Sequence, residues 1–145
     1  MILEAALLAA LAAAPAATTE QEVRDVEARF NAAYAANDMA TYWSFYDEAL
    51  TQWWPEGRVD LPTYKAQWTK LLADGGKVIS NTLSDVRVHV SPSGDAAVAS
   101  YKARVVTRQA DGRVTDEIAQ ESDVLFKKNG AWKVMHIHYD PKPAK

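Results

Sequence analysis

The sequence contains no cysteine, which excludes disulfide bonds, thiolate catalysis and cysteine-ligated zinc or iron–sulfur centres. It also has no run of lysine or arginine, and its formal net charge is -3. We therefore expect no surface for nucleic acid or anionic lipid. The one long apolar run, from Ile2 to Ala17, is shorter than the roughly 20 residues that span a bilayer. The mature protein is accordingly expected to have no membrane anchor.

That apolar run consists almost entirely of alanine and leucine. It closes with the small residues Ala14–Ala17, which are of the kind that signal peptidases accept. Residues 1–17 are therefore predicted to be a signal peptide, which places the protein in the periplasm or outside the cell. The basic start that signals normally have is missing, because the chain begins Met1-Ile2-Leu3-Glu4. The alternative is an Ala/Leu helix that packs on the domain.

The remaining chain, residues 18–145, is long enough for a single domain, and 48% of the whole sequence is apolar. Its first part has the pattern of a helix. Thr19 and Glu22 form a capping box, which predicts a helix start, and apolar residues then recur at steps of three and four until near Asn37.

Two shorter helices are predicted to follow. Asp38 can cap the first, which we expect to run through Tyr46. Asp60 and Pro62 can open the second, which is expected to stop at Gly75-Gly76. Between these two helices, residues 51–59 carry two tryptophans next to a Pro/Gly turn, which indicates a short hairpin.

From Lys77 onward the apolar residues alternate, as they do in strands. Three turn signals divide this part of the chain, at Ser91–Asp95, Asp111-Gly112 and Asn129-Gly130, which predicts a four-stranded antiparallel meander. Helices followed by a long meander are typical of an α+β fold, in which the sheet curls over the helices.

Alternation also sorts the strand residues into two faces. We expect the helices to cover a face that consists of Val86, Val88, Val90, Ala99, Tyr101, Ala103, Val105, Ile118, Gln120, Ser122 and Val124. The opposite face is charged and consists of Asp85, Arg87, His89, Lys102, Arg104, Glu117, Glu121 and Asp123. It is either a solvated face with cross-strand ion pairs or a subunit interface or pocket wall. A single bulge would exchange the faces beyond it.

This order of elements resembles the nuclear transport factor 2-like, or SnoaL-like, superfamily, and most closely the association domain of calcium/calmodulin-dependent protein kinase II. The resemblance extends from about Val23 to Pro143. Six short motifs occur in the same order as in that family: Val86-Arg87-Val88-His89-Val90, Gly94-Asp95-Ala96-Ala97, Asp111-Gly112, Gln120-Glu121-Ser122, Gly130-Ala131-Trp132 and His136-Ile137-His138.

The resemblance implies a cystatin-like cone, in which three N-terminal helices pack on a curved antiparallel sheet made of the short hairpin and the meander. It also implies a pocket beneath the sheet and assembly through the sheet into homodimers or larger rings. The family's pocket carries arginines. The corresponding positions here hold Asp123 and Tyr139, and Arg104 matches a third only after a shift of one residue. An anion site is therefore not expected.

The superfamily also resembles ketosteroid isomerase, but the catalytic groups of that enzyme are absent here. Phe30 stands where the tyrosine donor would be, and Trp54 where the carboxylate base would be. An enzymatic role would need another constellation. The best candidates are His136 and His138 with Glu121 or Asp123, because a carboxylate can orient a histidine that acts as general base. The alternative is that both histidines are structural.

A metal site would need a third ligand beside the two histidines, such as His89 or Glu121. We predict neither a metal nor a cofactor. Aromatic residues with polar tips can form the core or line a pocket for a flat apolar ligand. The predicted pocket residues are Tyr34, Trp43, Trp53, Trp54, Trp68, Tyr101, His136 and His138.

The sequence thus predicts a periplasmic or secreted, oligomer-forming domain with an apolar pocket. Its leading function is non-catalytic: assembly with its own copies, or binding of a small organic ligand. The alternative is a SnoaL-like lyase, isomerase or hydrolase with a histidine base. Fold alone does not decide between them, because this superfamily contains both enzymes and scaffolds.

Overall fold

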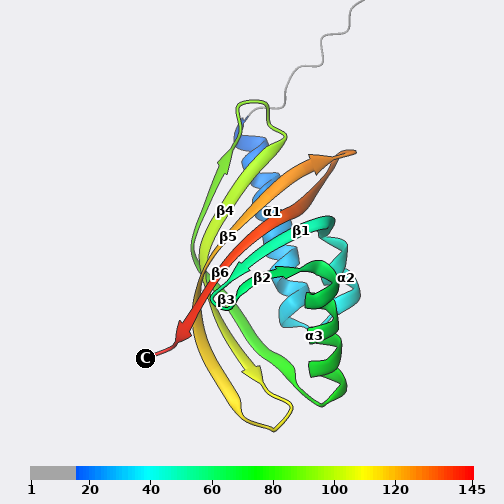
Figure 1. Cartoon of the computed structure of the whole chain (residues 1–145). Coiled ribbons are helices and arrows are strands. Elements are labelled where there is room, and N and C mark those ends of the chain that lie inside the picture. Colours follow the sequence, from blue (N-terminus) through cyan, green and yellow to red (C-terminus); the bar gives the residue numbers. More distant parts are fainter. Residues whose placement is uncertain (1–15) are drawn as a thin grey trace, which may run out of the picture.

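The computed structural model describes residues 16–145, and the predicted signal peptide lies almost entirely outside them. A curved sheet wraps around three helices, all on its concave side (Figure 1). This confirms the predicted α+β cone. The elements are α1 (Ala16–Ala35), α2 (Met39–Ser44), β1 (Tyr46–Trp54), β2 (Gly57–Asp60), α3 (Leu61–Ala73), β3 (Lys77–Val90), β4 (Ala96–Arg108), β5 (Val114–Lys128) and β6 (Ala131–Pro143).

Helix α1 begins earlier than the capping box predicts. It already includes Ala16, and Thr19 lies inside it with only 4% of its surface exposed. The prediction that Thr19 caps the helix is wrong, because the preceding alanines are good helix formers and continue it. Within residues 16–145, no helix is both long enough and apolar enough to cross a membrane.

Asn37 ends this first helical segment in the left-handed conformation, with φ 58°, which asparagine tolerates better than most residues. Its side chain then bonds the edge strand β3 twice. Asn37 Nδ2 donates to the carbonyl oxygen of Val78 at 2.9 Å, and the amide of Val78 donates to Asn37 Oδ1 at 2.8 Å. The end of α1 is thereby fixed to the edge of the sheet.

The two predicted caps of the shorter helices are confirmed. Asp38 accepts a bond from the amide of Thr41 at the start of α2, and Asp60 from the amide of Thr63 at the start of α3. Helix α2 is shorter than expected, since it ends at Ser44. Tyr46, which was expected in that helix, is instead the first residue of β1.

The sheet has six strands in the order β2-β1-β6-β5-β4-β3. The predicted hairpin and meander are both present. One part of the prediction is wrong: the sheet is mixed rather than antiparallel, because β1 pairs with β6 in parallel, with Gln52 opposite Ile137. This pairing joins the hairpin to the meander and makes one continuous concave surface.

The predicted faces are right for β3 and β4 and wrong for β5. Val88, Ala99 and Tyr101 are buried toward the helices, as expected. In β5, however, Glu121 pairs with Tyr101 and Asp123 with Ala99, and residues directly opposite each other share a face. Glu121 and Asp123 therefore lie on the concave face, whereas Ile118, Gln120, Ser122 and Val124 lie on the convex face.

A bulge in β6 reverses its alternation at Met135. Leu125 pairs with Val134 and its neighbour Val124 pairs with His136, so Met135 is an extra residue in the ladder. Val134 before the bulge and Ile137 after it are both buried. His136 and His138 consequently lie on the convex face, away from the helices.

The core between the helices and the concave face is rich in aromatic rings. Phe30 of α1 stacks on Tyr42 with the ring centroids 4.8 Å apart, and it meets the edge of Tyr46 at 5.3 Å. The tyrosine hydroxyls bond one another. Tyr46 Oη donates to Tyr42 Oη at 2.6 Å, and the hydroxyls of Tyr42 and Tyr64 lie 3.1 Å apart. Polar ring tips are thereby satisfied inside the core.

Candidate functional site

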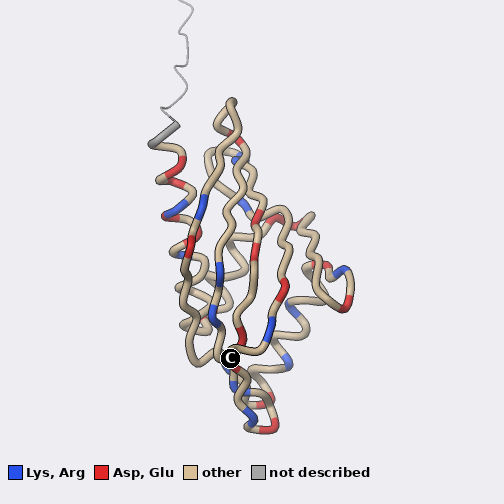
Figure 2. Tube along the Cα trace, turned by 90° about the vertical axis from the view of Figure 1, so that its left-hand side faces the viewer, with Lys and Arg blue, Asp and Glu red and all other residues tan. Residues whose placement is uncertain are grey.

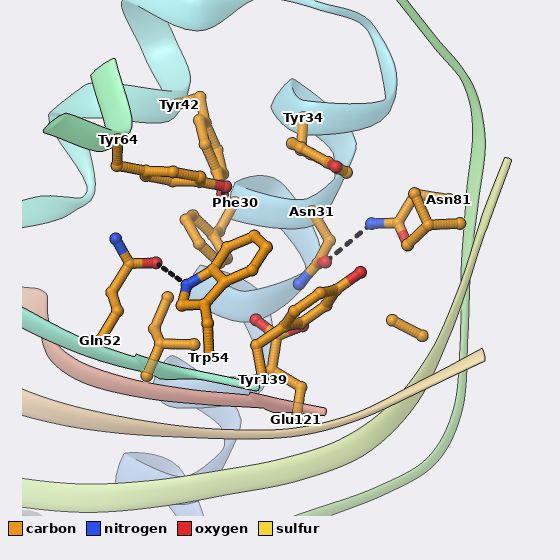
Figure 3. A pocket seen from close by; sticks show the side chains of 13 residues that line it. Phe30, Asn31, Tyr34, Tyr42, Gln52, Trp54, Tyr64, Asn81, Glu121 and Tyr139 are labelled. Atoms are coloured by element: carbon orange, nitrogen blue, oxygen red, sulfur yellow. Dashed lines mark hydrogen bonds between the residues drawn. The ribbon is translucent and has the colours of Figure 1, made fainter. Parts of the chain in front are cut away.

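A cavity of ≈ 30 Å³ lies between the helices and the concave face of the sheet (Figure 3). At about 10–15 Å³ for each water, it has room for about two water molecules. Aromatic and amide side chains make up most of its wall. The lining residues are Phe30, Asn31, Tyr34, Tyr42, Gln52, Trp54, Tyr64, Asn81, Ala103, Val105, Glu121, Ile137 and Tyr139.

Three rings form one wall of this cavity. The indole of Trp54 lies 4.7 Å from the ring of Tyr139 and 5.8 Å from that of Tyr64, measured between centroids. Trp54 Nε1 donates to Gln52 Oε1 at 3.2 Å, which fixes the orientation of both side chains. Gln52 is 1% exposed, and its Nε2 has no hydrogen-bond partner among the described residues.

Three carboxyl groups lie together at the cavity, and we call Glu27, Glu121 and Asp123 the acid cluster. Glu121 lines the cavity, and Glu27 and Asp123 are 1% and 0% exposed. Tyr101 Oη donates to Asp123 Oδ2 at 2.8 Å. Within residues 16–145, both carboxyl oxygens of Glu27 and Asp123 Oδ1 have no hydrogen-bond partner.

Burial controls the protonation of the acid cluster. Removal from water is the main cause that raises the pKa of Glu27 and of Glu121 well above the usual range, and neighbouring carboxylates raise both further. Burial raises the pKa of Asp123 to about 7, although the hydrogen bond that it accepts from Tyr101 opposes the shift. The cluster therefore holds protons at neutral pH that ordinary carboxyl groups would have lost.

Two asparagines connect the cavity to its surroundings. Asn81 Nδ2 donates to Asn31 Oδ1 at 2.8 Å, and Asn31 Nδ2 lies 3.4 Å from Tyr101 Oη. Asn81 Oδ1 has no donor among the described residues. The cavity thus offers a free amide donor at Gln52 and a free amide acceptor at Asn81.

The structure brings together part of the predicted pocket. Tyr34 and Trp54 line the cavity, and so does Glu121, which was predicted as a catalytic candidate. Trp68 and Trp43 pack behind the wall: Trp68 meets the edge of Tyr34 at 5.1 Å, and Trp43 meets Tyr64 at 5.4 Å. Tyr101 is buried against Asp123.

Three predicted pocket residues lie elsewhere. Trp53, His136 and His138 are on the convex face, because strand alternation turns Trp53 away from Trp54 and the β6 bulge turns the histidines outward. His136 Nδ1 lies 2.7 Å from Thr51 Oγ1. Partial burial lowers its pKa, and the nearby positive charge of Arg58 and then His138 act in the same direction.

The histidines and the acidic candidates are therefore on opposite faces of the sheet. A histidine base oriented by Glu121 or Asp123 is not formed, and neither is the alternative metal set of both histidines with Glu121. Among residues 16–145, no three histidine or acidic side chains are placed to hold a metal ion.

Several cavity residues were missed from the sequence. Glu27 carried a usable signal, because it falls between Val23 and Phe30 at steps of four and three on the buried face of α1. An acidic residue at such a position is either paired or functional. Asn31, Gln52 and Asn81 gave no comparable signal.

The sequence matches the family model "Calcium/calmodulin dependent protein kinase II association domain" over residues 19–143. The chain belongs to this family. This association domain also resembles solved structures. The association domain of C. elegans CaMKII is 24% identical, with a TM-score of 0.67 over 85% of this chain and 95% of that one.

Two further structures have the same fold. An NTF2-like protein from Cytophaga hutchinsonii is 18% identical, with a TM-score of 0.72 over 83% of this association domain and 95% of that chain. A protein with a cystatin-like fold from Nostoc punctiforme is 15% identical, with a TM-score of 0.61 over 86% and 91%. At these identities the likeness establishes the fold alone.

Proposed function

We propose that this protein assembles with its own copies, as a dimer or a larger ring, through the convex face of its sheet, and that its cavity binds a small organic molecule. The supporting observation is apolar surface on that face. Trp53, Val98, Ile118 and Phe126 are each 40–44% exposed there. Large exposed apolar side chains on neighbouring strands are typical of an interface.

The part of the convex face around Val98 is suited to contact with a second copy. Val98 pairs with Val124, and Val124 pairs with His136, so these side chains form a row across three strands. Charged residues of both signs are distributed along the strands of the sheet (Figure 2), and some of them lie on the convex face. One example is the bidentate pair of Arg104 with Asp116, at 2.9 and 2.6 Å. Because charges of both signs are present, two identical faces would not repel each other electrostatically.

A charge at Val98 on this face should dissociate the assembly. We expect Val98→Glu to convert the oligomer to monomers, since the buried carboxylate would have no partner and would cost several kcal/mol. Size-exclusion chromatography with light scattering measures the mass. Ile79→Glu is the matched control, because Ile79 is 47% exposed but lies on the edge strand β3. Dissociation by the control alone would show that the interface is elsewhere.

We also propose that residues 1–17 direct export and are removed. The match to the association domain family begins at residue 19, which leaves this apolar segment outside the family's domain. Expression of the full chain in a bacterium should yield a periplasmic protein whose first residue is Thr18, as measured by intact mass. A cytosolic protein that keeps its first residues would contradict the proposal.

The geometry favours binding over the enzymatic alternative. A SnoaL-like lyase, isomerase or hydrolase with a histidine base needs that histidine at its pocket, and no described residue lining the cavity is a histidine. The polar groups of the cavity are instead the free donor Gln52 Nε2, the free acceptor Asn81 Oδ1 and the carboxyl of Glu121. Such groups are suited to the recognition of a polar ligand.

A further inference from the structure

We propose that the cavity binds a short primary amino alcohol, with its ammonium group beside Glu121 and its hydroxyl oxygen toward Gln52. This inference depends on the proposed role of the cavity as a ligand site and names the chemical class of that ligand. It rests on the charge, the walls, the free polar atoms and the size of the cavity, which are independent observations.

The charge of the cavity favours a cation. Glu121 lies in its wall, with Glu27 and Asp123 buried behind, and none of the described lining residues is lysine, arginine or histidine. These carboxyl groups keep their protons while no positive charge is near them, because a buried carboxylate without a positive partner is costly. A ligand with a protonated amine beside Glu121 would allow that carboxyl to ionise and would pair with its charge.

The walls also suit an ammonium group. The faces of aromatic rings attract cations, with tryptophan the strongest of them. Trp54 and Tyr139, whose centroids are 4.7 Å apart, lie next to Glu121 (Figure 3). An ammonium group there would contact ring surface and carboxyl oxygen at once.

Free polar atoms indicate what else the ligand carries. Gln52 lines the cavity, is 1% exposed, and has an unpartnered Nε2. The side-chain oxygen of Gln52 already accepts a hydrogen bond from Trp54, so the nitrogen is the free atom. A buried donor of this kind is stabilised when the ligand supplies an acceptor. Asn81 Oδ1, a free acceptor, lies on the other side of Trp54 in Figure 3. The ligand therefore needs a donor at one end and an acceptor at the other.

The volume sets the length of the ligand. The cavity of ≈ 30 Å³ has room for about two waters. Waters in contact lie about 2.8 Å apart, roughly twice the length of a covalent bond between heavy atoms. Two water positions therefore correspond to a chain of about three or four bonded atoms, and ethanolamine, with four heavy atoms, is at the upper end of that length.

Isothermal titration calorimetry with ethanolamine, n-propylamine and propionate tests the proposal. We expect ethanolamine to bind in the millimolar range or tighter. Propylamine, which has the same length but no oxygen, should bind about threefold to tenfold more weakly. Propionate should not bind. Glu121→Gln should weaken ethanolamine at least about tenfold, whereas Glu56→Gln, a change in the exposed turn between β1 and β2 outside the cavity lining, should leave binding unchanged.

Three results would overturn the proposal: no ethanolamine binding at millimolar concentration, equal binding of propionate, or unchanged affinity in Glu121→Gln. Circular dichroism of each variant establishes that it is folded. Light scattering on the same samples separates the two proposals. An oligomer that does not bind ethanolamine contradicts the ligand class alone, and a monomeric parent protein contradicts the assembly.

Discussion

Raising the pH from about 5 to about 8 should lower the free energy of unfolding by about 3 kcal/mol. The cause is the acid cluster, and Asp123 alone accounts for that magnitude. Its pKa is raised from 3.8 to about 7, so between about pH 5 and 7 the folded state keeps a proton that the unfolded state has lost, and each pH unit of that range costs about 1.4 kcal/mol. A group with a raised pKa in the folded state stabilises the protein fully below its unfolded pKa, and this stability is lost as the pH rises through its folded pKa.

The range above about pH 5 is chosen because other carboxyl groups act in the opposite direction below it. Hydrogen bonds from Lys127 and Trp132 lower the pKa of Glu22, and the bond from Arg104 lowers that of Asp116. Such groups contribute stability above their unfolded pKa that is lost only in acid. They stay ionised throughout the range of the measurement.

Urea unfolding at several pH values, followed by tryptophan fluorescence, measures this dependence. Asp123→Asn should flatten the curve, because the amide does not titrate. A free energy of unfolding that rises between about pH 5 and 8 would contradict the predicted protonation of the cluster.

Replacing Phe30 by alanine should cost about 3–5 kcal/mol, the usual loss for a buried phenylalanine. Phe30 is 2% exposed and contacts three rings, Tyr42, Phe45 and Tyr46, at centroid distances of 4.8, 5.9 and 5.3 Å. Its removal would also enlarge the cavity that it lines. Since domains of this size are typically stable by about 5–15 kcal/mol, most of the stability could be lost.

Denaturant titration of Phe30→Ala at a pH near 6 tests this effect. The control is Ile79→Ala, because Ile79 is 47% exposed, and such surface changes usually stay within about 0.5 kcal/mol. Equal effects of the two substitutions would mean that the aromatic core around α1 does not stabilise the fold.

Local signals in the sequence predicted much of the fold. Asp38 and Asp60 cap the helices that follow them because each acts on an amide only three residues away. The turns at Asp111-Gly112 and Asn129-Gly130 are similarly local, and both glycines have positive φ. The family resemblance, carried by short motifs of this kind, is confirmed by the match over residues 19–143.

The site was harder to predict because it depends on pairing between distant residues. The pairing of Arg108 with Val114 sets which residues of β5 face the helices, and a shift of one residue inverts them all. The bulge at Met135 reverses β6 in the same way. No short pattern marks either feature. Of the predicted pocket residues, only Tyr34 and Trp54 line the cavity, and Gln52 and the two asparagines are found there in place of the histidines.

The double hydrogen bond between Asn37 and Val78 has a consequence for how copies of this protein can meet. Strand β3 is the outermost strand on its side of the sheet, where open backbone groups could recruit a strand from another molecule. The side-chain amide of Asn37 occupies the hydrogen-bonding positions that such a strand would use, since it both donates to and accepts from the backbone of Val78. Sheet extension from copy to copy, the route to fibrils, is blocked at that position.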